Sequence, residues 1–238
     1  MKYENRINKI VHAMVACKNR CEGMNTRDGH IPRCLILERK DDKGNYRKGR
    51  GCVVVGINPG HAGEKELIEY CKIKERNYDK LINDVNVNLL NKDYYKKLRN
   101  LVTELEFSGP ILWTELAKCE YKTYKEIKTY LETSRTSLVK NKLQAFRTCT
   151  QKYLIKELRA IPINWPLFAI GNESYNVLVY MFANRTVWKI PHPKGSRGHF
   201  SKLFDNRRRN GDKKLKLNSR NQLEKEIIYP FRSRIMNH

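Results

Sequence analysis

The chain has 238 residues, and its 48 Lys and Arg against 25 Asp and Glu give a formal net charge of +23 at pH 7. This length is enough to bury a sizeable core, so we expect residues 1–238 to form a single domain. No apolar segment approaches the roughly 20 residues of a transmembrane helix, and residues 1–14 lack the apolar core of a secretory signal. We therefore expect a cytoplasmic monomer without membrane contact.

The excess of positive charge predicts a polyanionic partner, because Lys and Arg bind phosphates and displace their counterions. Nucleic acid is the leading candidate. A lysine-rich solvated surface is the alternative, since net charge alone does not establish binding.

The apolar pattern predicts alternating helices and strands after a first helix over residues 4–20. Residues 22–50 are polar, apart from the more apolar stretch 31–37. Short apolar runs bounded by Gly, Pro or polar residues predict four buried strands at 52–57, 111–116, 166–170 and 187–190. Helical patterns fall at 64–75, 93–106, 124–131 and 143–158, and a further helix has Asn172 as its N-cap.

This alternation predicts an α/β fold, a three-layer sandwich with a central, mainly parallel four-stranded sheet. Within it we expect an N-terminal cysteine-bearing segment (1–50), a core (51–204) and a basic C-terminal segment (205–238). In such sheets the ligand crevice lies outside the carboxyl ends of the strands. INPGH follows the first strand, TELAKC ends the second, GNES follows the third and PHPKGSRGHF follows the fourth.

The segment GINPGHAGEK does not fit a nucleotide-binding loop. Glu66 stands where the P-loop requires a hydroxyl after its lysine. Asn58 replaces the second glycine of the dinucleotide pattern. We therefore expect no nucleotide cofactor, and the alternative for the segment itself is a tight turn in which Asn58 satisfies local backbone groups.

Four segments together resemble the uracil-DNA glycosylase superfamily over roughly residues 50–204. VVVGINPGH resembles the first motif of its mismatch-specific branch, and IPHPKGS resembles the second motif. ILWTELAKC is similar to the T-N-x-x-K-C segment of the iron-sulfur branch, and LFAIGNESYNVL to the third strand and its helix. The resemblance implies the fold of that superfamily and a monofunctional DNA glycosylase, with DNA as the partner.

The resemblance also implies roles for individual residues. Asn58 would orient the attacking water, and His192 would hydrogen-bond the O2 of the departing base. A turn histidine bonded to backbone is the alternative for His192. The resemblance implies a base pocket lined by Gly56, Ile57, Gly60, His61 and Glu115.

Two departures from the motifs bear on the substrate. Gly60 stands where uracil-specific enzymes have a tyrosine that blocks C5 of the base, and Glu115 replaces the asparagine that reads uracil. A carboxylate accepts from the exocyclic amine of cytosine. We therefore expect a 5-modified, even glucosylated, cytosine, as in phage DNA that bacterial defence enzymes attack. The alternatives are uracil or mismatched thymine, a non-catalytic nucleic-acid-binding protein, and a Glu115 that is tied up by a nearby lysine.

The seven cysteines are better explained as thiols or ligands than as disulfides in a reducing cytoplasm. Cys17, Cys21, Cys119 and Cys149 stand where the iron-sulfur branch holds a [4Fe-4S] cluster. Their C-x3-C spacing departs from the common C-x2-C, so zinc or unliganded thiols stay open.

The loop after His192 is expected to press on DNA. Lys194, Ser196 and Arg197 would contact phosphate or fill the space left by the flipped base; ordinary exposed loop charge is the alternative. Strand cleavage through a Schiff base is not expected, because no lysine stands at a catalytic position of the motifs. Aromatic residues that could stack on the base are Tyr70, Tyr78 and Trp113.

Overall fold

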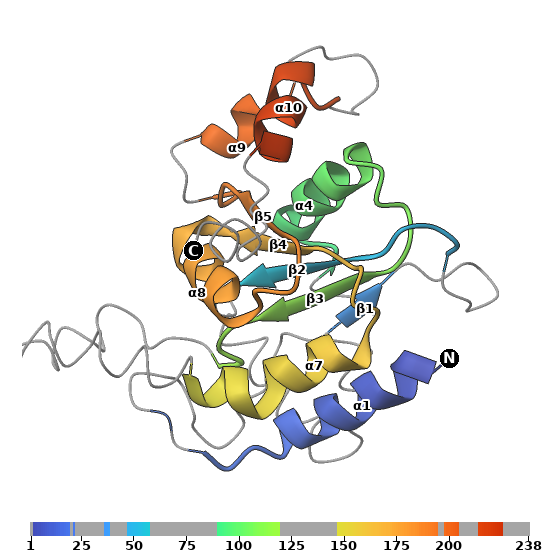
Figure 1. Cartoon of the computed structure of the whole chain (residues 1–238), viewed down its shortest axis with the longest axis vertical. Coiled ribbons are helices and arrows are strands. Elements are labelled where there is room, and N and C mark those ends of the chain that lie inside the picture. The colour runs from blue at the N-terminus through green and yellow to red at the C-terminus, as the bar shows by residue number, and fades with distance from the viewer. Residues whose placement is uncertain are drawn as a thin grey trace, which may run out of the picture. The chain divides into compact units, whose positions relative to one another are not determined.

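A computed structural model describes residues 2–19, 21, 36–38, 47–57, 90–119, 147–194, 198–204 and 214–225 (Figure 1). The chain divides into two compact units, each assembled from three stretches of sequence. The first unit comprises Met1–Leu35, Ile57–Asn86 and Thr114–Pro162, and the second comprises Ile36–Gly56, Val87–Trp113 and Ile163–His238. The single domain that we expect from the sequence stays a prediction. The helices expected at 64–75 and 124–131 lie outside the described residues.

The sheet contains all four strands expected from the apolar runs, and one more. Its strand order is β1-β3-β2-β4-β5. β2 is parallel to β4 and β4 to β5, whereas β1 is antiparallel to β3. The chain is therefore an α/β protein with a mixed five-stranded sheet. The bounds are β1 (Ile36–Glu38), β2 (Cys52–Gly56), β3 (Ile111–Glu115), β4 (Leu167–Ile170) and β5 (Val187–Ile190).

Burial explains why these runs form strands. Every residue of β2, β3 and β4 is buried, which is typical of strands covered on both faces. Beside them Phe107 meets Phe168 edge-to-face at 5.1 Å between ring centroids. Gly51 comes directly before β2. A side chain is excluded at this position, because a Cβ would lie 2.3 Å from the Trp165 ring. The strand positions are thus fixed by close packing of large aromatic side chains.

The helices of the second unit differ from the sequence expectation at one helix start. α4 (Asp93–Glu104) matches the predicted helix. α8 (Gly171–Met181), which packs on β2, β4 and β5, begins at Gly171, and its N-cap, Ile170, makes no side-chain cap. The expected N-cap at Asn172 is therefore wrong. The reason is the φ of +78° at Gly171, which turns the chain directly from strand into helix.

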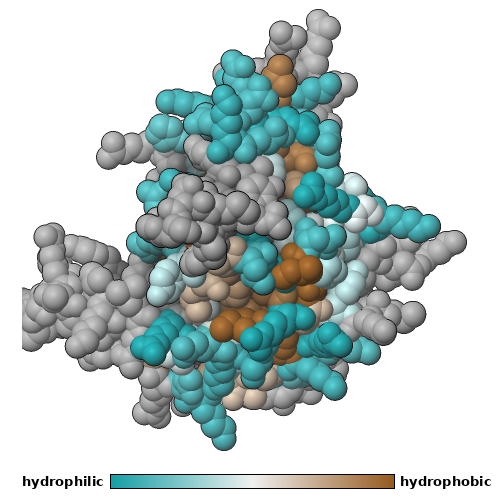
Figure 2. Space-filling view, viewed as in Figure 1, coloured by the Kyte–Doolittle hydropathy of each residue, from teal (hydrophilic) through white to brown (hydrophobic). Residues whose placement is uncertain are grey.

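Two short helices near the C-terminus carry a hydrophilic surface. α9 (His199–Lys202) and α10 (Leu217–Lys225) are joined through a β-bridge between Phe204 and Leu215. Figure 2 shows mostly hydrophilic side chains over them. Within the part of the chain that the structure describes, no helix is both long and apolar enough to cross a membrane.

The first unit has its own helical packing. α1 (Lys2–Val15) packs on α7 (Ile155–Ala160) and buries Ile7, Val11 and Met14. The first helix thus ends five residues earlier than the pattern predicts. A π-helical turn, η2 (Thr150–Leu154), precedes α7, and such turns are often found at functional sites.

Candidate functional site

The carboxyl ends of β2, β4 and β5 share one edge of the sheet, because these three strands are parallel. β2 ends at Gly56, which is buried, and Ile57 after it is half-buried. His192 comes two residues after β5. This edge is where a ligand crevice is expected. Five of the expected site residues lie outside the described residues: Asn58, Gly60, His61, Ser196 and Arg197.

His192 is half-buried and is held by its own turn. Its Nδ1 accepts a hydrogen bond from the backbone N–H of Lys194 at 3.1 Å. A neutral imidazole that accepts at Nδ1 carries its proton on Nε2. Burial, and then the charge of Lys194, lower the pKa of His192 below its ordinary value. The imidazole is therefore favoured in the neutral form that donates from Nε2.

Tyr94 contacts His192 from the first turn of α4. The two ring centroids are 5.5 Å apart, with a tilt of 48°. An aromatic contact of this kind restricts the orientation of the imidazole. Sequence reasoning missed Tyr94, because nothing in the local pattern distinguishes it from the next residue, Tyr95.

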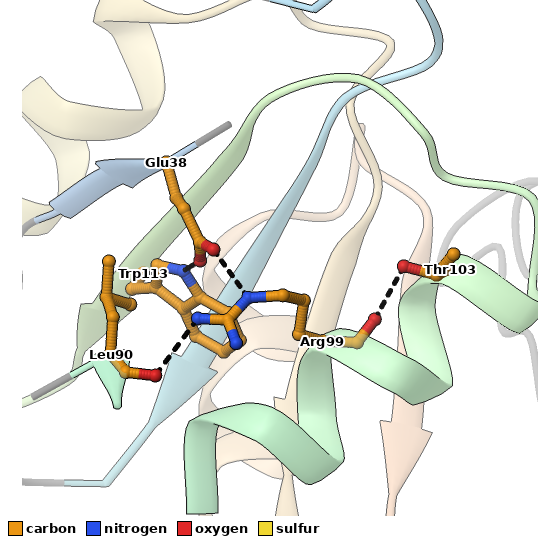
Figure 3. Close-up of polar contacts among 5 residues, drawn as sticks. All are labelled: Glu38, Leu90, Arg99, Thr103 and Trp113. Carbon is orange, nitrogen blue, oxygen red and sulfur yellow. Dashed lines mark hydrogen bonds and ion pairs between the residues drawn. The ribbon is translucent and has the colours of Figure 1, made fainter. Parts of the chain in front are cut away.

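Trp113, one of the expected stacking residues, belongs to a different network (Figure 3). Its indole N–H donates to Glu38 Oε2 at 2.6 Å, and Arg99 Nε donates to Glu38 Oε1 at 2.5 Å. Arg99 also donates to the carbonyl of Leu90, and Tyr95 packs edge-to-face on the indole. Trp113 is 3% exposed, so in this structure the indole is packed into the sheet, and its stacking role stays a prediction. Tyr70 and Tyr78 lie outside the described residues.

A fully buried ion pair follows β3 in the first unit. The Lys118 ammonium donates to Thr114 Oγ1 at 2.6 Å, to the Glu115 carbonyl at 2.7 Å and to Glu157 Oε2 at 2.9 Å. Thr114 also donates to Glu157 Oε2 at 2.6 Å. Lys118 is 2% exposed and Glu157 is fully buried. Glu115 itself is 8% exposed, and Lys118 is ion-paired with Glu157. The alternative in which a nearby lysine ties up Glu115 stays open.

The same segment is hydrogen-bonded to Ile57, which belongs to the same unit. The backbone N–H of Ala117 donates to the carbonyl of Ile57 at 2.9 Å. Ile57 is the last described residue before Asn58. The TELAKC segment and the GINPGH segment, which the resemblance assigns to one pocket, are thus hydrogen-bonded to each other.

The four expected ligand cysteines lie near one another in the first unit. Burial raises the pKa of Cys119, and the charges of Cys149, Cys21 and Cys17 raise it further. Burial likewise raises the pKa of Cys21, with further contributions from Cys149 and Cys17. Such mutual effects require that the thiols be close in space. None of these four cysteines forms a disulfide.

Positively charged and hydrogen-bonding groups surround the thiols. The backbone N–H of Lys118 hydrogen-bonds Cys149, and this bond and the Lys118 charge lower the Cys149 pKa against the larger effect of burial. Lys152 Nζ lies 3.8 Å from Cys17 Sγ, and its charge lowers the pKa of Cys21. Four thiols beside ammonium groups and a backbone N–H fit an anionic iron-sulfur cluster in donor chemistry.

A single bound metal ion requires that all of its ligands converge on one point, which an iron-sulfur cluster does not require. Within the described ranges, no group of three or more His, Cys, Asp or Glu side chains is arranged to hold one ion. Four thiolates on one zinc ion converge on a single centre, whereas those on a [4Fe-4S] cluster each bind a different iron. Comparisons of the chain with protein-family models, with curated proteins and with solved structures find no match.

Proposed function

We propose that this protein is a monofunctional DNA glycosylase, which flips a base out of DNA, hydrolyses its N-glycosidic bond and leaves an abasic site. The observation that carries this proposal is the state of His192. Its Nδ1 accepts the Lys194 N–H and its pKa is lowered, so at neutral pH it offers an N–H donor at the carboxyl edge of the sheet. Such a donor stabilises negative charge on O2 of a departing base.

Asn58 is the residue proposed to orient the attacking water. It stands two residues after β2, at the edge where ligands bind in open α/β sheets. An amide is too weak a base to deprotonate water, but it orients water toward the sugar carbon, and positioning supplies much of a rate enhancement. The proposal includes a glycosylase-like sheet of four mainly parallel strands.

The proposed substrate is a 5-modified cytosine, including its glucosylated forms, in phage DNA. Gly60 leaves the C5 side of a base open, and Glu115 provides a carboxylate at the carboxyl end of β3. That carboxylate accepts from the cytosine amine and repels the O4 of uracil. Gly56, Ile57 and His61 complete the proposed pocket.

The proposed cofactor is a [4Fe-4S] cluster held by Cys17, Cys21, Cys119 and Cys149. Such a cluster supplies a cross-link between distant stretches of chain. The chemistry of excision needs none of its electrons, so its role in this proposal is structural. Iron analysis and visible absorbance of the purified protein test it; a colourless protein without iron, when prepared anaerobically, contradicts it.

We further propose that the protein is a cytoplasmic monomer and that DNA is its partner. Lys194 is exposed beside His192, and with Ser196 and Arg197 it is proposed to contact the DNA backbone and the space left by the flipped base. Lys118 is unsuited to Schiff-base chemistry, because its ammonium makes three hydrogen bonds in the interior. The abasic strand therefore stays intact.

Excision from labelled oligonucleotides tests the function. The panel contains cytosine, 5-hydroxymethylcytosine, its glucoside, uracil and a mismatched thymine, each followed by alkaline cleavage at abasic sites. We expect release of modified cytosine, and a loss of about 10²–10³-fold in kcat for His192→Ala. Asn58→Ala should lose excision and keep DNA affinity.

Other results of the oligonucleotide panel would overturn different parts of the proposal. Uracil or thymine release without action on modified cytosine overturns the substrate and keeps the enzyme class. Salt-dependent DNA binding with no abasic sites overturns the enzyme and leaves a binding module. Unaltered excision by Asn58→Ala overturns the role of that residue.

A further inference from the structure

We infer that Lys118 is a positioning residue for Ile57, and through Ile57 for the next residue, Asn58, acting through the hydrogen bond between Ala117 and Ile57. This inference rests on the proposed function for its catalytic consequence. Its structural part, the control of the Ala117–Ile57 contact by a buried ammonium group, stands on the geometry of the first unit alone.

The Lys118 side chain bonds its own segment, residues 114–118. The Lys118 ammonium bonds the Glu115 carbonyl three residues back at 2.7 Å, and it bonds Thr114 Oγ1 at 2.6 Å. These two contacts fold the side chain over its own segment and close the backbone between Glu115 and Lys118. The N–H of Ala117, inside this closed stretch, donates to Ile57 at 2.9 Å. The ammonium therefore determines where that N–H points.

Glu157 connects this segment to α7. Glu157, in α7, accepts from both Lys118 and Thr114 through one oxygen, Oε2. Lys118 and Glu157 have side-chain exposures of 2% and 0%. Burying two charges costs much of the energy that their attraction returns, so such pairs contribute more to a specific geometry than to stability. α7 thus holds the segment in one arrangement.

The same segment also contacts one of the four thiols and carries another. The Lys118 backbone N–H bonds Cys149, and Cys119 is the next residue. One short segment therefore bears a bond to Ile57, a bond to Cys149 and a thiol of its own. A displacement of the segment moves the Ile57 carbonyl that accepts the Ala117 N–H. The displacement is transmitted to Asn58, because that carbonyl belongs to the peptide unit that Ile57 shares with Asn58.

Amide hydrogen exchange tests the structural part without any substrate. In Lys118→Met, the Ala117 amide should exchange at least about tenfold faster, while the amides of β4 keep their protection. Glu157→Gln, a milder change that keeps an oxygen acceptor, should give a smaller increase. Arg185→Met removes another buried cation, one that bonds the Trp165 carbonyl in the second unit, and should leave Ala117 unaffected. Wild-type exchange at Ala117 in folded Lys118→Met or Glu157→Gln overturns the inference.

A double-mutant cycle tests the catalytic part. Lys118→Met should lower kcat by roughly 10²-fold, as a misplaced group does, with KM unchanged. In an Asn58→Ala background, where the residual rate is measured over long incubation with enzyme in excess over DNA, the same change should lower that rate no further, because the two residues act as one unit. Independent, multiplicative losses show a merely structural role and overturn the inference. If the wild-type protein excises no base, the proposed function fails, and the exchange of Ala117 alone then decides the positioning.

Discussion

The segment after β3 and the turn after β5 are held in opposite ways. After β3, the enclosed Lys118 ammonium bonds Oε2 of Glu157, which is enclosed in α7. After β5, His192 is half-buried, its Nδ1 accepts the backbone N–H of Lys194, and its ring contacts Tyr94. A fixed interior network suits a support, whereas a half-exposed donor suits a group that exchanges water for a ligand. The difference predicts that changes in the two regions will affect different properties.

The largest expected effect is on stability. Lys118→Met leaves the Glu157 carboxylate buried without its cation, which should cost about 3–5 kcal/mol of unfolding free energy. His192→Ala should cost less than about 1.5 kcal/mol, since it removes one hydrogen bond of a half-buried group. Urea unfolding measures both. Replacement of the whole network, Thr114→Val with Lys118→Met and Glu157→Leu, is the control, and it should recover most of the loss. Equal losses for Lys118→Met and His192→Ala would contradict the comparison.

Trp113 extends the same distinction to the aromatic residues. Trp113→Phe removes the donor to Glu38 Oε2 and should cost about 1–3 kcal/mol of stability. Excision at a temperature where the variant is folded should stay at the wild-type rate, because the indole is packed against Tyr95 and is almost inaccessible. A loss of excision without a loss of stability would return Trp113 to the list of base-stacking residues.

Tyr94 is expected to behave in the reverse manner. Its contact with His192 should be worth about 0.5–1.5 kcal/mol, so Tyr94→Leu should lower excision several-fold. The side chain is only partly buried, and unfolding should change little. Tyr95→Leu is the matched control on the next residue, and it should affect stability more than excision, because Tyr95 packs on Trp113. Identical kinetics for Tyr94→Leu and the wild type would remove the ring contact from the site.

The strands were predictable from the sequence because each is a short apolar run that ends at Gly, Pro or a polar residue. β1 was missed, since its three residues gain their strand character only by pairing with β3. The start of α8 was misplaced because the φ of Gly171 is not visible in a residue pattern.

The motifs predicted only part of what the structure describes around the candidate site. The resemblance implied that Cys17, Cys21, Cys119 and Cys149 lie together, and the pKa effects among these thiols require that they be near one another, while their role as ligands stays a prediction. The Lys118–Glu157 pair joins residues 39 positions apart, and the contact of Tyr94 with His192 also depends on tertiary packing. Local periodicity contains no signal for either contact.

The smallest expected effect concerns the pH dependence of excision. Burial first, and then the Lys194 charge, lower the His192 pKa from its ordinary value of 6.5. The neutral donor is therefore retained at pH 6.5, and excision should fall only as the pH drops through the lowered pKa. The unfolded chain takes up its proton first, so the stability due to neutral His192 begins to fall as the pH drops through 6.5 and is lost as the pH drops through the lowered pKa of the folded state. Lys194→Ala should move the acid limb of kcat upward by about a few tenths of a pH unit, because Lys194 is exposed and screened.

Lys214→Ala is the matched control for this small shift, since Lys214 is also exposed but does not affect the His192 pKa. Added salt should reduce the difference between Lys194→Ala and the wild type, because it screens exposed charges. Activity that falls as the pH rises through the lowered His192 pKa would show that the charged imidazole is the active form. In that case the backbone bond to Nδ1 would have to break during turnover, because a doubly protonated ring cannot accept it. The turn after β5 would then be a moving part, and its contrast with the fixed segment after β3 would become greater.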